Sequence, residues 1–176
     1  MILSWRSYLL KHYSYMNILY IDVQNVIGRV WVYWREIDRG KFYDYVTKRY
    51  NIDKVYYVVW YLPHLINEYA LIQLHWYCLL FKDSLIKDGK TKWNVDIDIA
   101  IRSIFDLTDG TLKQAYLMTN DWDYNTLIKT FQEYWVWGRL ITPDIRTASR
   151  ALTRIVQDPI DLQYIRKLVE KQKSTH

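Results

Sequence analysis

Short apolar runs alternate along this chain with longer segments in which apolar side chains recur at helical spacing. The runs are rich in β-branched and aromatic residues, which is typical of strands, and they cover residues 17–23, 54–61, 79–82, 114–119 and 139–142. The helical spacing predicts helices over residues 41–50, 64–77, 95–107, 123–134, 146–156 and 160–172. The polar segment 88–94 predicts a loop.

The alternation of these elements predicts a three-layer α/β fold. Continuous apolar strands are typical of a parallel sheet that helices cover on both faces. We therefore expect a Rossmann-like central sheet of about five parallel strands, in the order 3-2-1-4-5. For helix 95–107, the spacing predicts that the side chains facing the sheet are Ile97, Ile101, Ile104 and Phe105.

Composition and charge indicate the number of domains, the class of partner and the cellular compartment. The 176 residues suit one domain. The net charge of +5 is compatible with a polyanionic partner and equally with a basic solvated surface. The single cysteine, Cys78, excludes an internal disulfide and favours a reducing compartment, so we expect a cytoplasmic protein. No apolar run approaches the roughly 20 residues of a membrane span, so we expect no membrane partner.

Acidic and amide side chains gather just after the predicted strands and in the first turn of helix 95–107. In open parallel sheets, ligands bind at this edge, where the strand order reverses. If the first and fourth strands are neighbours, these side chains converge in one crevice. They are Asp22, Gln24 and Asn25 after the first strand, Asp96 and Asp98 in the helix, and Asn120, Asp121 and Asp123 after the fourth strand, where Thr119 lies as well.

Carboxylates packed this closely repel one another unless a divalent cation lies among them. Oxygen ligands select hard ions, so the cluster predicts Mg²⁺ or Mn²⁺. Such an ion polarises a phosphodiester and activates water, which makes metal-assisted phosphodiester hydrolysis the reaction that we expect. Each acid alone also has a structural interpretation, because Asp96 and Asp98 suit a helix N-terminus and Asp123 suits an N-cap. The position of the whole set favours the metal site.

Other chemistries find less support in the sequence. The turn after the first strand contains one glycine, Gly28, and so lacks a glycine-rich phosphate loop. The histidines and the single cysteine form no metal-binding pattern, and His64 and His75 fall on a predicted helix. Cys78 lies among apolar residues, which favours a packing role over a nucleophilic one.

Three segments resemble the motifs of NYN domains, a family of PIN-like nucleases. Residues 21–26 (IDVQNV) resemble the first motif, usually I-D-G-x-N followed by a hydrophobic residue. Residues 92–98 (KWNVDID) resemble the K-G-x-V-D-hydrophobic-D segment, and residues 117–124 (LMTNDWDY) resemble the S-G-D-[SG]-D-[FY] motif. The resemblance covers about residues 16–172 and is to small bacterial, LabA-like members of the family.

This resemblance implies a PIN-like fold and a metal-dependent ribonuclease with RNA as its partner. It implies that the metal ligands and catalytic residues are Asp22, Asp96, Asp121 and Asp123, with Asp98 as a secondary candidate. It further implies substrate contacts from Asn25, Asn120, Lys90, Lys92 and Arg146; Asn25 would orient Asp22 or contact phosphate. Met16 falls where family members often begin. Residues 1–15 are therefore interpreted as an N-terminal extension or a misplaced start, and residues 16–176 as one domain.

Tryptophan stands at several positions where the family has glycine. Trp93 and Trp122 interrupt two motifs, Trp60 and Trp76 fall where similar proteins often have glycine, and Val23 replaces another glycine. The chain has 9 tryptophans but only 5 glycines, whereas glycine usually makes up about 7% of a protein. Two interpretations remain open. Either the chain is a divergent, catalytically impaired member, or its source reads UGA as glycine.

Three functional hypotheses follow from these residues. The first is a ribonuclease that uses Mg²⁺ or Mn²⁺. The second is a non-catalytic RNA-binding or protein-interaction module on the same fold. The third is a receiver-like or phosphatase-like domain, which accounts for Asp22 but leaves Asn25 and the Asp121/Asp123 turn unassigned. The sequence leaves both a monomer and a homodimer open.

Overall fold

A six-stranded parallel sheet forms the centre of the molecule. The computed structural model describes residues 15–26, 36–82, 86–87, 90–91 and 95–171. The strands of the sheet are β1 (Met16–Asp22), β2 (Lys54–Trp60), β3 (Cys78–Lys82), β6 (Leu112–Met118), β7 (Trp137–Thr142) and β8 (Ile160–Asp161). Their order is β3-β2-β1-β6-β7-β8, or 3-2-1-4-5-6 counted along the chain. The predicted α/β class and the order of the first five strands are confirmed.

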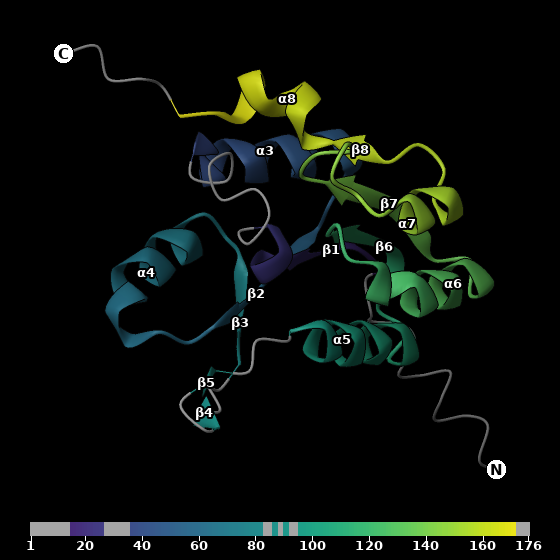
Figure 1. The fold of residues 1–176 in the computed structure, drawn as a ribbon, viewed down its shortest axis with the longest axis horizontal. Helices are drawn as coiled ribbons and strands as arrows, with labels where there is room; N and C mark the ends of the chain where they lie inside the picture. The colour runs from purple at the N-terminus through teal and green to yellow at the C-terminus, as the bar shows by residue number, and fades with distance from the viewer. Residues whose placement is uncertain (1–14, 27–35, 83–85, 88–89, 92–94, 172–176) are drawn as a thin grey trace.

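Helices cover both faces of this sheet (Figure 1). On one face lie α3 (Arg39–Tyr50) and α8 (Leu162–Val169), and on the other lie α5 (Asp96–Thr108), α6 (Asn125–Glu133) and α7 (Arg150–Ile155). The connection from β2 to β3 consists of the 3-10 turn η1 (Pro63–Leu65) and α4 (Ile66–Leu74), and the turn η2 (Trp122–Tyr124) lies between β6 and α6. In the part of the chain that the structure describes, no helix combines the length and apolarity needed to cross a membrane.

The central strand β1 shows why continuous apolar runs fit this architecture. Leu19 and Ile21 belong to the core on the α3/α8 face, whereas Ile18 and Tyr20 belong to the core on the α5/α6 face. All four side chains are fully buried. A strand between two layers of helices has no solvent-facing side, so both of its faces must be apolar. This burial fixes the end of β1, and with it the position of Asp22.

The packing of α5 differs from the sequence prediction. The apolar spacing places Ile97, Ile101 and Phe105 toward the sheet, yet their exposed fractions are 60%, 52% and 56%. Ile104, which was expected on the same face, is partly buried. The predicted inward face is therefore wrong for three of its four residues, and an apolar stripe of α5 faces solvent.

A polar contact with β1 accounts for this orientation. The buried residues of α5 are Ile99, Ser103 and Asp106. The Asp106 carboxylate accepts hydrogen bonds from the Tyr20 hydroxyl (2.9 Å) and from Arg102 Nε (3.1 Å). A buried hydroxyl and a buried carboxylate are costly unless paired, so this contact selects the face of α5 that meets the sheet.

Short elements account for two other differences. The antiparallel strands β4 (Ile86–Lys87) and β5 (Lys90–Thr91) form a two-stranded sheet that includes part of the predicted loop. The first two residues of predicted helix 160–172 instead form β8, and Asp161 caps α8 by accepting a hydrogen bond from the backbone N–H of Gln163 (2.9 Å). Segments of two residues carry too little periodicity to be recognised in a sequence.

Two exposed tryptophans occupy backbone conformations that favour glycine. Trp76 has φ = 66° and Trp135 has φ = 59°, and their exposed fractions are 79% and 92%. Both follow the last turn of a helix, where glycine commonly adopts this left-handed conformation. Trp60 and Trp122 are not among the residues with positive φ in the described part of the chain, and Trp93 and residues 1–14 lie outside it. The backbone thus favours glycine at position 76, but not at 60 or 122.

Candidate metal centre

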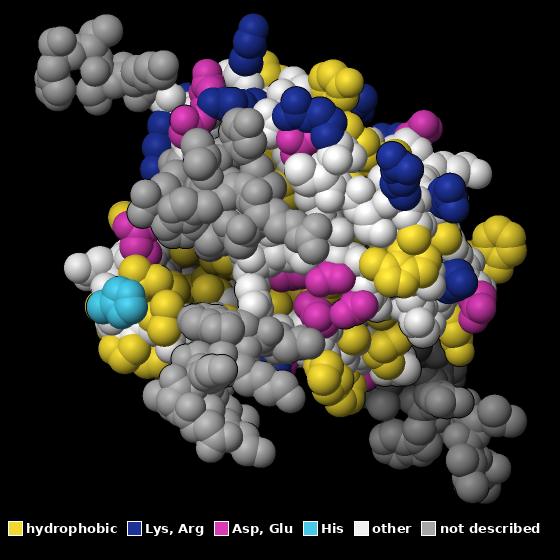
Figure 2. All heavy atoms as spheres, viewed as in Figure 1, with side chains coloured by type: hydrophobic (Ala, Val, Ile, Leu, Met, Phe, Trp, Pro, Cys, Tyr) yellow, Lys and Arg dark blue, Asp and Glu magenta, His cyan; other side chains and the backbone are white. Residues whose placement is uncertain are grey.

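Three carboxylates converge at the carboxyl ends of β1 and β6. Asp96 begins α5, Asp121 precedes η2 as its N-cap, and Asp123 lies within that turn. One oxygen of each carboxylate lies within 4.8 Å of the others. Figure 2 shows acidic side chains gathered near the middle of this face of the molecule. The structure therefore brings together three of the four acids that the sequence singles out as metal ligands.

Asn25 connects the ends of the two central strands. Its side-chain Nδ2 donates a hydrogen bond to Asp121 Oδ2 (3.1 Å), and its Oδ1 accepts one from the backbone N–H of Asn120 (3.3 Å). Its backbone N–H donates to Asp22 Oδ1 (3.0 Å). Asp121 Oδ1 in turn accepts from the backbone N–H of Asp123 (3.1 Å). The Asn25 side chain thus orients Asp121, while its backbone holds Asp22.

Asp22 is the buried carboxylate of this site. Its exposed fraction is 1%, and Thr119 Oγ1 donates a hydrogen bond to its Oδ2 (3.1 Å). Burial raises the pKa of the Asp22 carboxyl from 3.8 to about 7, opposed by the backbone N–H of Asn25, and the charges of Asp96 and Asp121 raise this pKa further. Asp22 is outside the set of three converging oxygens, so its role as a metal ligand stays a prediction.

Tyr124 holds the other side of the site. Its hydroxyl donates a hydrogen bond to Asp96 Oδ1 (3.0 Å), and 2% of its side chain is exposed. Burial raises the pKa of this hydroxyl, as do the charges of Asp22 and Asp96. Burial likewise raises the pKa of Asp96, while the Tyr124 hydrogen bond lowers it. The phenol therefore stays protonated and serves as a donor.

This arrangement fits a divalent cation. Three carboxylate oxygens from two separate segments point at one volume, which is the ligand set that Mg²⁺ and Mn²⁺ take in proteins. Without a cation, mutual repulsion and burial penalise the charged forms, as the raised pKa values of Asp22 and Asp96 show. A cation among these groups would reverse that penalty.

Two residues that were predicted to contact substrate, Asn120 and Arg146, are already bonded to other side chains of the protein. Asn120 is 1% exposed; its Nδ2 donates to Thr147 Oγ1 (2.9 Å), and its Oδ1 accepts from Thr142 Oγ1. Arg146 is bound in bidentate fashion to Asp144, through Nε (3.0 Å) and one terminal nitrogen (2.7 Å). Asn120 is therefore placed to support the loop after β6, and Arg146 enters any phosphate contact already paired with a carboxylate.

The remaining candidates from the sequence are two lysines and Asp98. Lys90 lies in β5, and Lys92 lies outside the described residues. Asp98 forms an ion pair with Lys82 at the end of β3. The Lys82 charge also lowers the pKa of Asp96, so this lysine belongs to the electrostatic surroundings of the site.

Three residues that shape the site have no role assigned from the sequence alone. Thr119 directly follows β6, so its position at a strand end was the available signal. Lys82 ends β3, and the same rule finds it once the sheet order is known. Tyr124 occupies the aromatic position of the segment 117–124 that resembles the S-G-D-[SG]-D-[FY] motif, and this was the available signal. Its contact with Asp96, 28 positions away, is not visible in the sequence.

Comparison with known proteins supports the fold. No protein-family model and no curated protein matches the chain. The chain is similar to the crystal structure of a protein of unknown function from Vibrio parahaemolyticus, with a TM-score of 0.71 and 17% sequence identity. The similarity covers 86% of this chain and 94% of that one. At this identity the likeness establishes a shared fold and carries no function.

Proposed function

We propose that this chain is a metal-dependent ribonuclease that hydrolyses RNA phosphodiester bonds at the carboxyl ends of β1 and β6. The observation that carries this proposal is the convergence of Asp96, Asp121 and Asp123 within 4.8 Å. The resemblance to NYN domains supports it independently, since these same acids match two of the family's motifs. The net charge of +5 is compatible with a polyanionic substrate.

In this proposal, Asp96, Asp121 and Asp123 hold Mg²⁺ or Mn²⁺. When bound, the cation polarises a phosphodiester and lowers the pKa of a water molecule. The protein's part is to fix the ligand geometry before substrate arrives. Asn25 holds Asp121 through its side chain, and the Tyr124 hydroxyl holds Asp96. Such supporting contacts orient metal ligands and maintain their charge.

Cleavage of a labelled single-stranded RNA tests the proposal. With Mn²⁺ or Mg²⁺ present, wild-type protein should cleave, and EDTA should abolish cleavage. Asp123→Asn should lower kcat/KM by about 100-fold, because charge stabilisation by a bound cation is worth several kcal/mol. Asp123 is exposed, so its substitution leaves the fold intact, and Asp109→Asn, at an exposed position after α5, is the matched control. Cleavage that persists in EDTA, or in Asp123→Asn, would rule the proposal out.

The alternative proposal is a non-catalytic RNA-binding or protein-interaction module. Its support is Trp122, which lies between two of the acids with 39% of its side chain exposed. A folded protein that binds RNA but cleaves none would establish this alternative. Changing Trp93 and Trp122 to glycine and repeating the assay would then show whether the tryptophans block catalysis.

The receiver-like or phosphatase-like hypothesis has less support. Phosphorylation of Asp22 requires an accessible carboxylate, whereas this one is 1% exposed and accepts hydrogen bonds from Thr119 and Asn25. We also propose that the protein is located in the cytoplasm. It rests on Cys78, the single cysteine of the chain.

A further inference from the structure

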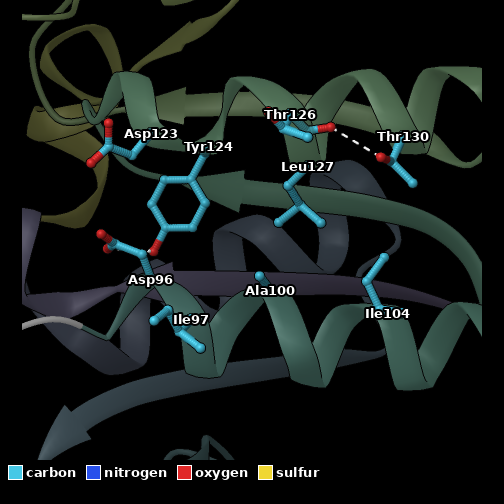
Figure 3. Close-up of a pocket in the computed structure, with 9 residues that line it drawn as sticks. All are labelled: Asp96, Ile97, Ala100, Ile104, Asp123, Tyr124, Thr126, Leu127 and Thr130. Carbon is cyan, nitrogen blue, oxygen red and sulfur yellow. Dashed lines mark hydrogen bonds between the residues drawn. The ribbon is translucent and has the colours of Figure 1, made fainter.

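An open groove of about 430 Å³ leads away from the carboxylates between α5 and η2/α6. Figure 3 shows Asp96, Asp123 and the Tyr124 ring at one end of this groove, with Ala100 and Leu127 further along it. The groove is thus continuous with the candidate metal centre. Its volume falls within the range of about 300–1,000 Å³ that is usual for small-molecule sites.

The charge of this groove limits what it can hold. Among the residues that line it, Asp96 and Asp123 are the charged ones, and none is lysine or arginine. A phosphate backbone running along the groove would meet carboxylates and apolar side chains without compensating cations. The groove can therefore take a phosphate only at the end with the carboxylates, where a cation would lie. Along the rest of its length it requires a neutral group.

The shape and lining of the groove favour an apolar occupant with polar edges. Beyond the acids, its walls are formed by Ile97 and Ala100 of α5 and by Leu127 of α6, and the hydroxyl-bearing Thr126 and Thr130 also line it. Ile97 has an exposed fraction of 60%, so apolar surface is open to an incoming group. A nucleobase has this character, because its faces are apolar and its edges form hydrogen bonds.

We propose that the groove binds one nucleobase of a single-stranded RNA, next to the phosphodiester that lies at Asp96, Asp121 and Asp123. This inference rests on the proposed ribonuclease function and specifies its substrate. In a duplex, each base is stacked and paired, so placing one in the groove would require flipping it out. The groove therefore selects single strands over duplexes.

A scan with abasic substrates tests the inference. The probes are ten-nucleotide RNAs that lack the base at one position each, cleaved by wild-type protein with Mn²⁺. Loss of the base that occupies the groove should raise KM about tenfold or more, because the base no longer buries its apolar surface against the groove. Loss at other positions should have little effect, and a duplex of the same sequence should be a poor substrate.

Variants of α5 provide the structural control. Ala100→Phe fills the groove, whereas Ile101→Phe adds a similar ring one residue along the helix, at an exposed position that does not line the groove. Ala100→Phe should raise KM about tenfold for the intact RNA and remove the sensitivity to the abasic position. Ile101→Phe should behave as wild type. The affinity for Mn²⁺ should be the same in all three proteins.

The outcomes separate this inference from the proposed function. If wild type cleaves RNA with Mn²⁺ but the abasic scan is flat, the groove assignment is wrong and the nuclease stands. Duplex cleavage as efficient as single-strand cleavage would also overturn the assignment, as would unchanged base sensitivity in a folded Ala100→Phe protein. If wild type neither binds Mn²⁺ nor cleaves RNA, the proposed function fails, and the inference fails with it.

Discussion

The buried Asp22 carboxyl makes stability depend on pH in a way that one substitution can isolate. In the metal-free protein, burial raises its pKa from 3.8 to about 7. For a raised carboxyl pKa, the folded state binds the proton more tightly than the unfolded state. The folded protein therefore loses stability as pH rises from about 4 to about 7. Asp22→Asn removes this titration while keeping an oxygen that can accept from the backbone of Asn25.

The magnitude follows from the two pKa values. Taking 3.8 for the unfolded chain and about 7 for the folded protein, the carboxyl lowers the free energy of unfolding by about 2 kcal/mol at pH 5 and by about 4 kcal/mol at pH 8. The advantage of Asp22→Asn over wild type should therefore grow by about 2 to 3 kcal/mol between these two conditions. Any effect of the amide on stability that does not depend on pH is the same at pH 5 and pH 8, so it cancels when the two differences are compared.

Urea denaturation in EDTA, followed by tryptophan fluorescence, measures this difference. Asp109→Asn, which alters an exposed carboxylate after α5, is the control and should track wild type at both conditions. If the free-energy difference between Asp22→Asn and wild type is the same at pH 5 and pH 8, the carboxyl is not held protonated. The account of the site's electrostatics would then be wrong.

Three further predictions concern metal affinity and the fold. Asn25→Ala should weaken Mn²⁺ binding about 10- to 100-fold in a calorimetric titration, because Asp121 loses its orienting partner; unchanged affinity would contradict this. Trp135→Gly should raise the free energy of unfolding by about 1 kcal/mol, because glycine adopts the left-handed conformation without strain. The neighbouring Tyr134→Gly, at φ = −90°, should lower it, and a loss in both variants would remove the argument for glycine. Asp106→Ala should cost about 2 kcal/mol by urea denaturation, because the buried Tyr20 hydroxyl loses its acceptor; a neutral effect would refute this account of how α5 packs.

The sheet could be predicted from the sequence because its strands are buried on both faces. The continuous apolar runs of β1, β2 and β6 fit few positions other than strands between two layers of helices. The face of α5 could not be predicted from spacing alone, since its apolar residues extend from exposed Ile97 and Ile101 to buried Ile99. The choice among them depends on Asp106 meeting Tyr20, and such a pairing between distant segments leaves no periodic signal.

For the site too, the residues at strand ends could be predicted, whereas the contacts between distant segments could not. Asp96, Asp121 and Asp123 could be selected because parallel strands end at one edge and the sheet order brings those ends together. The supporting contacts of Tyr124 and Thr119 depend on side-chain directions that only the folded chain fixes. The apolar groove beside the acids could not be predicted either, because it exists only through the unexpected orientation of α5.

A titration with Mn²⁺, followed by electron paramagnetic resonance of the free ion, tests the central claim most directly. The account predicts that wild type and Asp109→Asn bind Mn²⁺ with the same affinity, and that Asp121→Asn and Asp123→Asn each lose about tenfold or more in affinity. Folded wild-type protein that binds no Mn²⁺, or acid variants that bind it as wild type does, would contradict a metal centre at these carboxylates.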